Sequence, residues 1–254
     1  ETEVEGVLRL MEQVYSTLGL KDYSYRLSLG DPEDKEKYVD NPEMWEKGEA
    51  LLRRVLQKVG LEFYEAKGEA AFYGPKIDVQ FKTAAGKDET LVTVQVDFHL
   101  PAQFELEYIT ADGGKARPIM VHRGVLSTME RMVALLIEEY KGNFPLWLAP
   151  TQVILLPVAD RNNEYAEQVA AQLRKHRFRV EVDARSERVP AKVRDAKLRK
   201  IPYLLVVGDK DAAANEVSVN VPGAAGTNGR GDTGATPVDE FIKNVVVERD
   251  TKAL

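Results

Sequence analysis

The sequence predicts two domains of different architecture: an antiparallel β-sheet with helices on one face, then a three-layer α/β domain with a mixed, mainly parallel sheet. Two segments, 77–82 and 91–98, alternate apolar and polar side chains, as half-buried strands do. A continuous apolar run at 152–158 then opens a strand–helix–strand–helix–strand order, which is typical of parallel strands buried on both faces. A proline-bracketed connector separates the two patterns. The predicted domains are therefore 1–147 and 148–254.

Three helices and a hairpin complete the first predicted domain. Apolar side chains at helical spacing predict an opening helix over residues 4–18. A second helix has Asn41 as its N-cap and ends at Gly60. A hairpin turns through residues 112–114, and a third helix is expected over 124–140. The predicted core face of this third helix consists of Val125, Met129, Met132, Val133, Leu136, Ile137 and Tyr140.

The second predicted domain continues the alternation of strands and helices. A glycine-rich segment at 222–237 is expected to be a surface loop. The remaining predicted elements are helices at 162–175, 189–200 and from 237 onward, and strands at 178–182, 203–207 and 216–221.

Composition limits the classes of function. The chain has 254 residues, 44% of them hydrophobic, and no cysteine, so a packed core is expected and thiolate metal sites are excluded within it. No run approaches the ~18 apolar residues of a membrane span, and the acidic opening helix is unlike a signal peptide, so we expect a cytoplasmic protein with no membrane partner. The net charge is −6, but residues 174–200 carry +7, a local charge that suits nucleic acid. The chain begins with Glu1 inside a helical pattern, so we expect it to be cut from a longer polypeptide.

Arg131, on the third predicted helix, is a candidate anion-binding residue. The residues one turn before it, among them Ser127 and Thr128, are small enough to let a ligand approach the backbone. The alternative is a solvated arginine that contacts Leu135 or forms a salt bridge with Glu138. Periodicity alone leaves both interpretations open.

A polar row on the predicted strand 91–98 is a second candidate feature. Thr93, Gln95 and Asp97 share one face of this strand, which indicates either the floor of a small-molecule site or a face in solvent. His122 lies just before the third helix. By itself it is either a hydrogen-bonded structural histidine or a metal ligand.

Four segments, 68–78, 93–109, 117–140 and 144–150, closely resemble the threonyl-tRNA synthetases, a class IIa aminoacyl-tRNA synthetase family. The resemblance covers nearly the whole chain. It implies a class II catalytic domain that lacks motifs 1 and 2, followed by an anticodon-binding domain. It also implies activation of L-threonine with ATP and Mg²⁺, transfer of threonine to tRNA-Thr, and a homodimer in the full enzyme.

The resemblance also implies roles for individual residues. Arg131 matches the motif 3 arginine that binds the triphosphate of ATP, and His122 matches one of three ligands of a zinc ion that recognises threonine. Arg131 and Lys76 are implied as the catalytic residues. The implied substrate and ATP positions are Tyr73, Lys76, Thr93, Gln95, Thr128 and Arg131. The implied tRNA contacts are Arg185, Glu187, Lys192, Arg194 and Asp211.

Several departures from the family pattern qualify this expectation, among them Ser186, Pro190 and Asn220 in the second domain. Ser127 stands where motif 3 usually has glycine, and residues 89–92 read Glu-Thr-Leu-Val in place of the usual residues. Since motif 2 and two zinc ligands are absent, the zinc site is expected to be incomplete and the isolated chain inactive. An alternative is a non-catalytic synthetase-like protein that binds tRNA or a protein partner. A prolyl-tRNA synthetase is a weaker alternative.

Overall fold

A computed structural model describes residues 1–83, 86–222 and 231–254, so part of the predicted loop at 222–237 lies outside the described residues. The chain forms two compact units, Glu1–Glu138 and Glu139–Leu254. The division falls in the last turn of helix α4 (Met129–Tyr140). The domain limits 1–147 and 148–254 stay a prediction.

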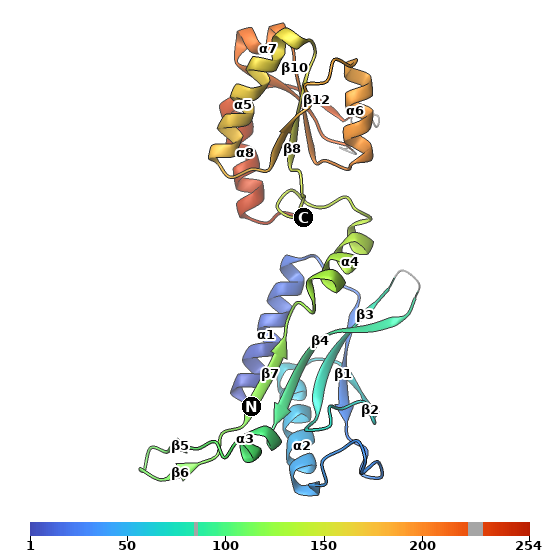
Figure 1. Ribbon diagram of the computed structural model, residues 1–254, viewed down its shortest axis with the longest axis vertical. Coiled ribbons are helices and arrows are strands. Elements are labelled where there is room, and N and C mark those ends of the chain that lie inside the picture. The colour runs from blue at the N-terminus through green and yellow to red at the C-terminus, as the bar shows by residue number, and fades with distance from the viewer. Residues whose placement is uncertain (84–85, 223–230) are drawn as a thin grey trace. The chain divides into compact units, whose positions relative to one another are not determined.

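The first unit is built on a five-stranded sheet. Its strands lie in the order β2-β1-β3-β4-β7, and all neighbours are antiparallel except β1 and β2. Strands β5 and β6 form a separate hairpin that projects from this unit (Figure 1). Before α4 the elements are α1 (Thr2–Thr17), β1 (Tyr23–Leu29), α2 (Pro42–Val59), β2 (Phe63–Lys67), β3 (Lys76–Lys82), β4 (Asp88–Asp97), α3 (His99–Gln103), β5 (Tyr108–Ile109), β6 (Lys115–Ala116) and β7 (Met120–Gly124).

Helices α1 and α2 cover one face of this sheet, as the sequence predicted (Figure 1). Leu8 and Leu52 from the helices and Leu27, Ile77 and Val94 from the strands are completely buried. Each such side chain contributes roughly 1.5–3 kcal/mol to folding through the hydrophobic effect. Because side chains alternate across a strand, the intervening positions of β1, β3 and β4 project from the other face. That polar face carries the candidate site.

Local signals predicted the ends of α2 correctly. The Asn41 Oδ1 accepts a hydrogen bond from the Met44 N–H at 3.1 Å, and Gly60 ends the helix with φ +80°. Strands β1 and β2 were not predicted. Strand β1 alternates buried Tyr25 and Leu27 with polar residues, so its pattern was present in the sequence, whereas β2 is a largely exposed edge strand.

Helix α4 corrects one prediction. The helix begins at Met129 and not at residue 124, and its buried residues are Met132, Leu135 and Leu136. The expected core residues Met129, Val133 and Ile137 are instead 77%, 43% and 49% exposed. An apolar pattern indicates which side chains favour burial, but only the neighbouring elements determine which of them are covered.

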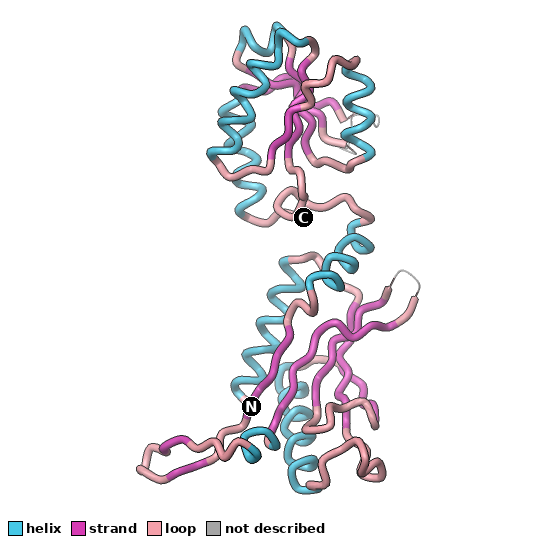
Figure 2. Tube along the Cα trace, viewed as in Figure 1, coloured by secondary structure: helices cyan, strands magenta, loops and turns pink. Residues whose placement is uncertain are grey.

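The second unit is a three-layer α/β domain, as predicted. Its sheet order is β12-β11-β10-β8-β9. Strands β10, β8 and β9 run parallel to one another, whereas β11 is antiparallel to both of its neighbours, β10 and β12. Helices α5 and α8 pack on one face and α6 on the other (Figure 2). Helix α7 was not predicted, and residues 232–237, which were expected to belong to the surface loop, instead form strand β12. The elements are β8 (Val153–Pro157), a 3₁₀ turn (Asp160–Asn162), α5 (Asn163–Lys175), β9 (Val180–Val182), α6 (Val189–Leu198), β10 (Tyr203–Val207), α7 (Asp209–Ala214), β11 (Glu216–Asn220), β12 (Asp232–Pro237) and α8 (Val238–Asp250).

Candidate functional site

The polar face of the first sheet brings most of the predicted substrate residues together. Lys76 on β3, Gln95 on β4 and His122 on β7 lie directly opposite one another in register. In the next row, Asp78 on β3 lies opposite Thr93 on β4. Directly opposed residues project from the same face of a sheet. The register therefore places four predicted site residues, Lys76, Thr93, Gln95 and His122, on one surface.

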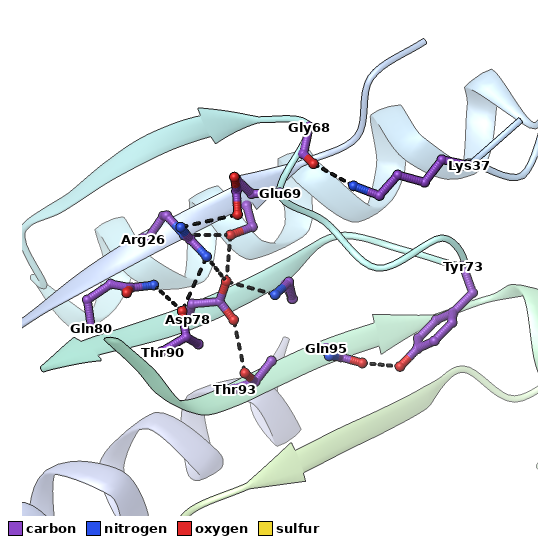
Figure 3. Close-up of polar contacts among 12 residues, drawn as sticks. Arg26, Lys37, Gly68, Glu69, Tyr73, Asp78, Gln80, Thr90, Thr93 and Gln95 are labelled. Carbon is purple, nitrogen blue, oxygen red and sulfur yellow. Dashed lines mark hydrogen bonds and ion pairs between the residues drawn. The ribbon is translucent and has the colours of Figure 1, made fainter. Parts of the chain in front are cut away.

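Asp78 is the centre of a hydrogen-bond network on this face (Figure 3). Its side chain is fully buried, and four side chains contact its carboxylate: Arg26 Nη2 at 2.8 Å, Ser28 Oγ at 2.7 Å, Lys76 Nζ at 2.9 Å and Thr93 Oγ1 at 2.9 Å. Burial raises the pKa of Asp78, but the hydrogen bonds from Arg26, Ser28 and Lys76 outweigh burial and hold the pKa below its ordinary value. Asp78 therefore stays ionised at neutral pH and fixes the positions of Lys76 and Thr93.

A second group of polar side chains lies at the end of β4. The Tyr73 hydroxyl donates a hydrogen bond to Gln95 Oε1 (Figure 3), and the Tyr73 ring lies 5.6 Å from the His122 ring. His122 Nε2 lies 2.8 Å from Oδ2 of Asp97, which is fully buried. Burial raises the pKa of Tyr73, so its hydroxyl is a hydrogen-bond donor at neutral pH. Tyr73, Gln95 and His122 thus form one connected cluster.

Arg131 lies on the exposed side of α4. Its side chain is 55% exposed, its Nη2 lies 3.6 Å from Glu89 Oε1, and its Nη1 donates to the Thr90 carbonyl at 3.3 Å. The Arg131 N–H donates to Thr128 Oγ1 at 3.4 Å, so Thr128 supports the first turn of the helix. Glu138 lines the same small cavity as Glu89 and Arg131. The guanidinium is therefore open to solvent, lies at ion-pair distance from Glu89, and shares a cavity with Glu138.

The residues around His122 do not complete a zinc site. A catalytic zinc needs three protein ligands. Within residues 1–83, 86–222 and 231–254, no three His, Cys, Asp or Glu side chains are grouped so that they could hold a metal ion. His122 has Asp97 beside it, and these two groups alone are insufficient. That the isolated chain binds no stoichiometric zinc stays a prediction.

The predicted tRNA-binding residues lie around the carboxyl ends of the parallel strands in the second unit. Arg185 follows β9 and pairs with Asp183 at 2.7 Å and with Asp195 at 3.1 Å, and Glu187 is exposed two residues later. Asp211 lies in α7, which follows β10. In open α/β sheets, ligands bind in the crevice outside the carboxyl ends of the strands. This edge is the candidate RNA-binding surface.

The side chains within this surface differ in accessibility. Arg194 is 72% exposed and can reach a ligand. Lys192 is only 3% exposed, and its Nζ donates to the Pro157 carbonyl at 3.0 Å and to the Asp183 carbonyl at 2.9 Å. The Asp211 carboxylate accepts hydrogen bonds from the Gly208 N–H and the Ser218 hydroxyl. Lys192 and Asp211 therefore serve the fold at this edge, whereas Arg194 faces solvent.

Three important residues were not assigned a role from the sequence. Asp78 stood at a polar position of a predicted alternating strand, which was the available signal for it. Arg26 lies on β1, and because that strand was not predicted, nothing connected it with Asp78. Glu89 was noted only as a departure from the family pattern. Its contact with Arg131 follows from the approach of α4 to β4, which no local pattern encodes.

Comparison with known families gives this arrangement an identity. Residues 1–140 match the model of the tRNA synthetase class II core domain (G, H, P, S and T), which is more than half of the chain. The chain belongs to the class II tRNA synthetases. Residues 152–248 match the anticodon binding domain, so the second unit of this class II synthetase corresponds to that module. No helix in the described part of the chain has both the length and the apolar character needed to cross a bilayer.

Relatives of this class II synthetase chain identify the branch that it resembles. It is 51% identical over 249 residues to the threonine–tRNA ligase of Oceanobacillus iheyensis, which covers 98% of this chain and 38% of that protein. It is 57% identical over 218 residues to the threonine–tRNA ligase of Geobacillus sp. (strain WCH70), covering 85% of this chain and 34% of that protein. The chain thus spans little more than a third of the length of these relatives.

Solved structures agree with this assignment. The RNA binding domain of threonyl-tRNA synthetase from Cryptosporidium parvum superposes with a TM-score of 0.88 at 30% identity, covering 97% of this chain and 60% of that one. A prolyl-tRNA synthetase from the same organism reaches a TM-score of 0.53 at 19% identity over 72% of this chain and 41% of that one, a likeness of fold alone. The threonyl branch therefore fits better than the prolyl alternative.

Proposed function

We propose that this chain is the part of a threonine–tRNA ligase that carries the floor of the ATP and threonine site together with the anticodon-binding domain. The complete enzyme would form threonyl-adenylate from ATP and L-threonine and transfer threonine to the 3′ end of tRNA-Thr. The observation that carries the proposal is the identity of about half of all residues to threonine–tRNA ligases over nearly the whole chain. The shared polar face of β3, β4 and β7 supports it.

Arg131 is proposed to stabilise the charge that develops on pyrophosphate during adenylate formation. A fixed guanidinium placed beside such charge is preorganised electrostatic catalysis. The polar row supplies hydrogen-bonding groups for the substrates, and a site that hydrogen-bonds a substrate hydroxyl rejects analogues that lack it. Tyr73, Gln95 and Thr93 are proposed to fill this role, with Lys76 held beside them by Asp78. ATP is expected to bind as its Mg²⁺ complex.

The decisive test is threonine-dependent exchange of pyrophosphate into ATP by the intact natural polypeptide. Replacing Arg131 with alanine is expected to cost about 2–4 kcal/mol of transition-state stabilisation, as loss of one preorganised donor does. Arg54→Ala is the matched control, because Arg54 is an exposed arginine on α2, one of the helices that cover the other face of the sheet. If wild type shows exchange and Arg131→Ala shows exchange at the same rate, the proposed role of Arg131 is refuted.

The second unit is proposed to bind tRNA-Thr through the edge that carries Arg185, Glu187 and Arg194. Filter binding of tRNA to the 254-residue chain should weaken as salt rises, because phosphate contacts release counterions. Arg194→Gln should weaken binding, whereas Lys21→Gln, an exposed position of the first unit, should not. Equal binding of tRNA-Thr and unrelated tRNAs would contradict anticodon recognition.

A non-catalytic tRNA-binding protein is the second candidate, because Glu89 on β4 puts a carboxylate beside Arg131. It would bind tRNA-Thr yet show no exchange as the intact natural polypeptide. Absence of both activities would refute both candidates. For the ligase we also expect a cytoplasmic location and a homodimer. Sedimentation of the intact polypeptide would test whether it is a homodimer.

A further inference from the structure

The Arg131 side chain makes two contacts with β4 that bear on its ligand affinity. Its Nη2 lies 3.6 Å from Glu89 Oε1, and its Nη1 donates to the carbonyl of the next residue, Thr90, at 3.3 Å. Both charged side chains remain in contact with solvent, with Arg131 55% and Glu89 44% exposed. One nitrogen of the guanidinium thus donates to a backbone carbonyl of β4, and another lies at ion-pair distance from the carboxylate of the preceding residue.

The charge around Arg131 is unfavourable for an anion. A cavity of about 110 Å³ lies beside the guanidinium, and its charged lining residues are Arg131, Glu89 and Glu138. Two carboxylate side chains and one guanidinium therefore line this cavity. A phosphate that approaches Arg131 meets repulsion from these carboxylates, and it must also replace the acceptors that the guanidinium already has.

We propose that Glu89 is an intramolecular counter-ion that competes with polyphosphate for Arg131 and so lowers the affinity of the site. This inference rests on the proposed role of Arg131 in binding the ATP phosphates. A guanidinium binds carboxylates and phosphates through the same N–H groups, so Glu89 and a phosphate compete for the nitrogen Nη2, which lies 3.6 Å from the Glu89 carboxylate. Glu89 thereby tunes affinity without contacting the substrate.

The expected effect follows from the exposure of the pair. Exposed ion pairs change an equilibrium by roughly twofold to fivefold, because solvent screens them and two long side chains must be ordered. Replacing Glu89 with glutamine removes the charge and keeps the shape of the side chain. Affinity for inorganic pyrophosphate should therefore rise about twofold to fivefold at low salt, and the gain should shrink at high salt.

The experiment is a titration of the 254-residue chain with inorganic pyrophosphate, followed by the side-chain Nε–Hε NMR signals of the arginines. The Arg131 signal is assigned by its absence in Arg131→Ala. Glu89→Gln is compared with wild type and with Glu62→Gln, which makes the same chemical change at an exposed position between α2 and β2. A fourth protein carries Glu89→Gln together with Arg131→Ala.

The inference expects tighter binding in Glu89→Gln, no change in Glu62→Gln, and no gain from Glu89→Gln once Arg131 is replaced. Wild-type affinity in Glu89→Gln, with weaker binding in Arg131→Ala, overturns the role of Glu89 and leaves that of Arg131 standing. Equal gains with and without Arg131 show a general charge effect and overturn competition at the guanidinium. Identical titrations of wild type and Arg131→Ala overturn the anion site itself, and with it the proposed role of Arg131.

Discussion

Replacing Asp78 with asparagine is expected to destabilise the first unit strongly. The buried carboxylate is shared by Arg26 and Lys76, whose side chains are only 15% and 17% exposed. Asparagine keeps the size of the side chain but removes the charge, so two largely buried cations face each other without their counter-ion. Arg26 keeps a second partner, Glu69, at 3.3 Å. The loss of the Asp78 charge therefore affects Lys76 more than Arg26, because Arg26 retains its ion pair with Glu69.

The magnitude follows from these contacts. Removing one partner of a buried ion pair costs about 3–5 kcal/mol, because the remaining charge is left desolvated and uncompensated. The retained pair with Glu69 and the partial exposure of both cations place the expected loss near the lower limit, at about 3 kcal/mol. The surface pair of Asp88 with Lys82, at 3.0 Å and with both side chains more than half exposed, provides the contrast. Asp88→Asn should change the free energy of unfolding by about 0–1 kcal/mol.

Urea unfolding followed by tryptophan fluorescence measures this difference. The chain has two tryptophans, Trp45 in the first unit and Trp147 in the second, so a Trp147→Phe background reports the first unit alone. Asp78→Asn should shift the midpoint far more than Asp88→Asn, with the slope unchanged. A loss below about 1 kcal/mol for Asp78→Asn would refute the network as a source of stability.

The same pair of proteins should show a defined pH dependence. The pKa of Asp78 is lowered in the folded state, so its contribution is fully present above the ordinary carboxyl pKa of about 3.9 and is lost as pH falls through the folded value. The stability difference between wild type and Asp78→Asn should therefore stay constant at neutral pH and shrink below about pH 4. A difference that grows toward acid pH would contradict the direction of this shift.

Three further predictions concern two single positions and the zinc content of the chain. Ser127 has φ +57°, a conformation that favours glycine, so Ser127→Gly should raise the free energy of unfolding by about 1 kcal/mol in the same urea assay; a decrease would contradict this. A Cβ at Gly74 would lie 2.2 Å from the Val96 carbonyl oxygen, so Gly74→Ala should destabilise the unit and displace Tyr73, which loss of the Tyr73 to Gln95 contact in NMR spectra would report. Elemental analysis of the isolated chain should find well under one zinc per chain, and stoichiometric zinc would refute the ligand count.

The sequence alone determined most of the architecture. Alternation in 77–82 and 91–98 predicted β3 and β4, Asn41 and Gly60 predicted the ends of α2, and the order of apolar runs predicted the three-layer second unit. These are properties of consecutive residues, and helix and strand periodicities make them readable without tertiary contacts. The family resemblance likewise depended on short contiguous segments, and the comparisons confirmed it.

The tertiary structure decided how the candidate site is connected. Arg26, Asp78 and Thr93 meet because β1, β3 and β4 pair in one particular register, and Glu89 meets Arg131 because α4 approaches β4. The burial of individual side chains could not be predicted from the sequence either, since the apolar pattern of α4 did not show that Val133 would face solvent. Register and burial depend on residues distant in sequence, and a shift of one residue would move every side chain of a strand to the other face. The sequence therefore identified candidate site residues, but only the tertiary structure determined which residues contact one another.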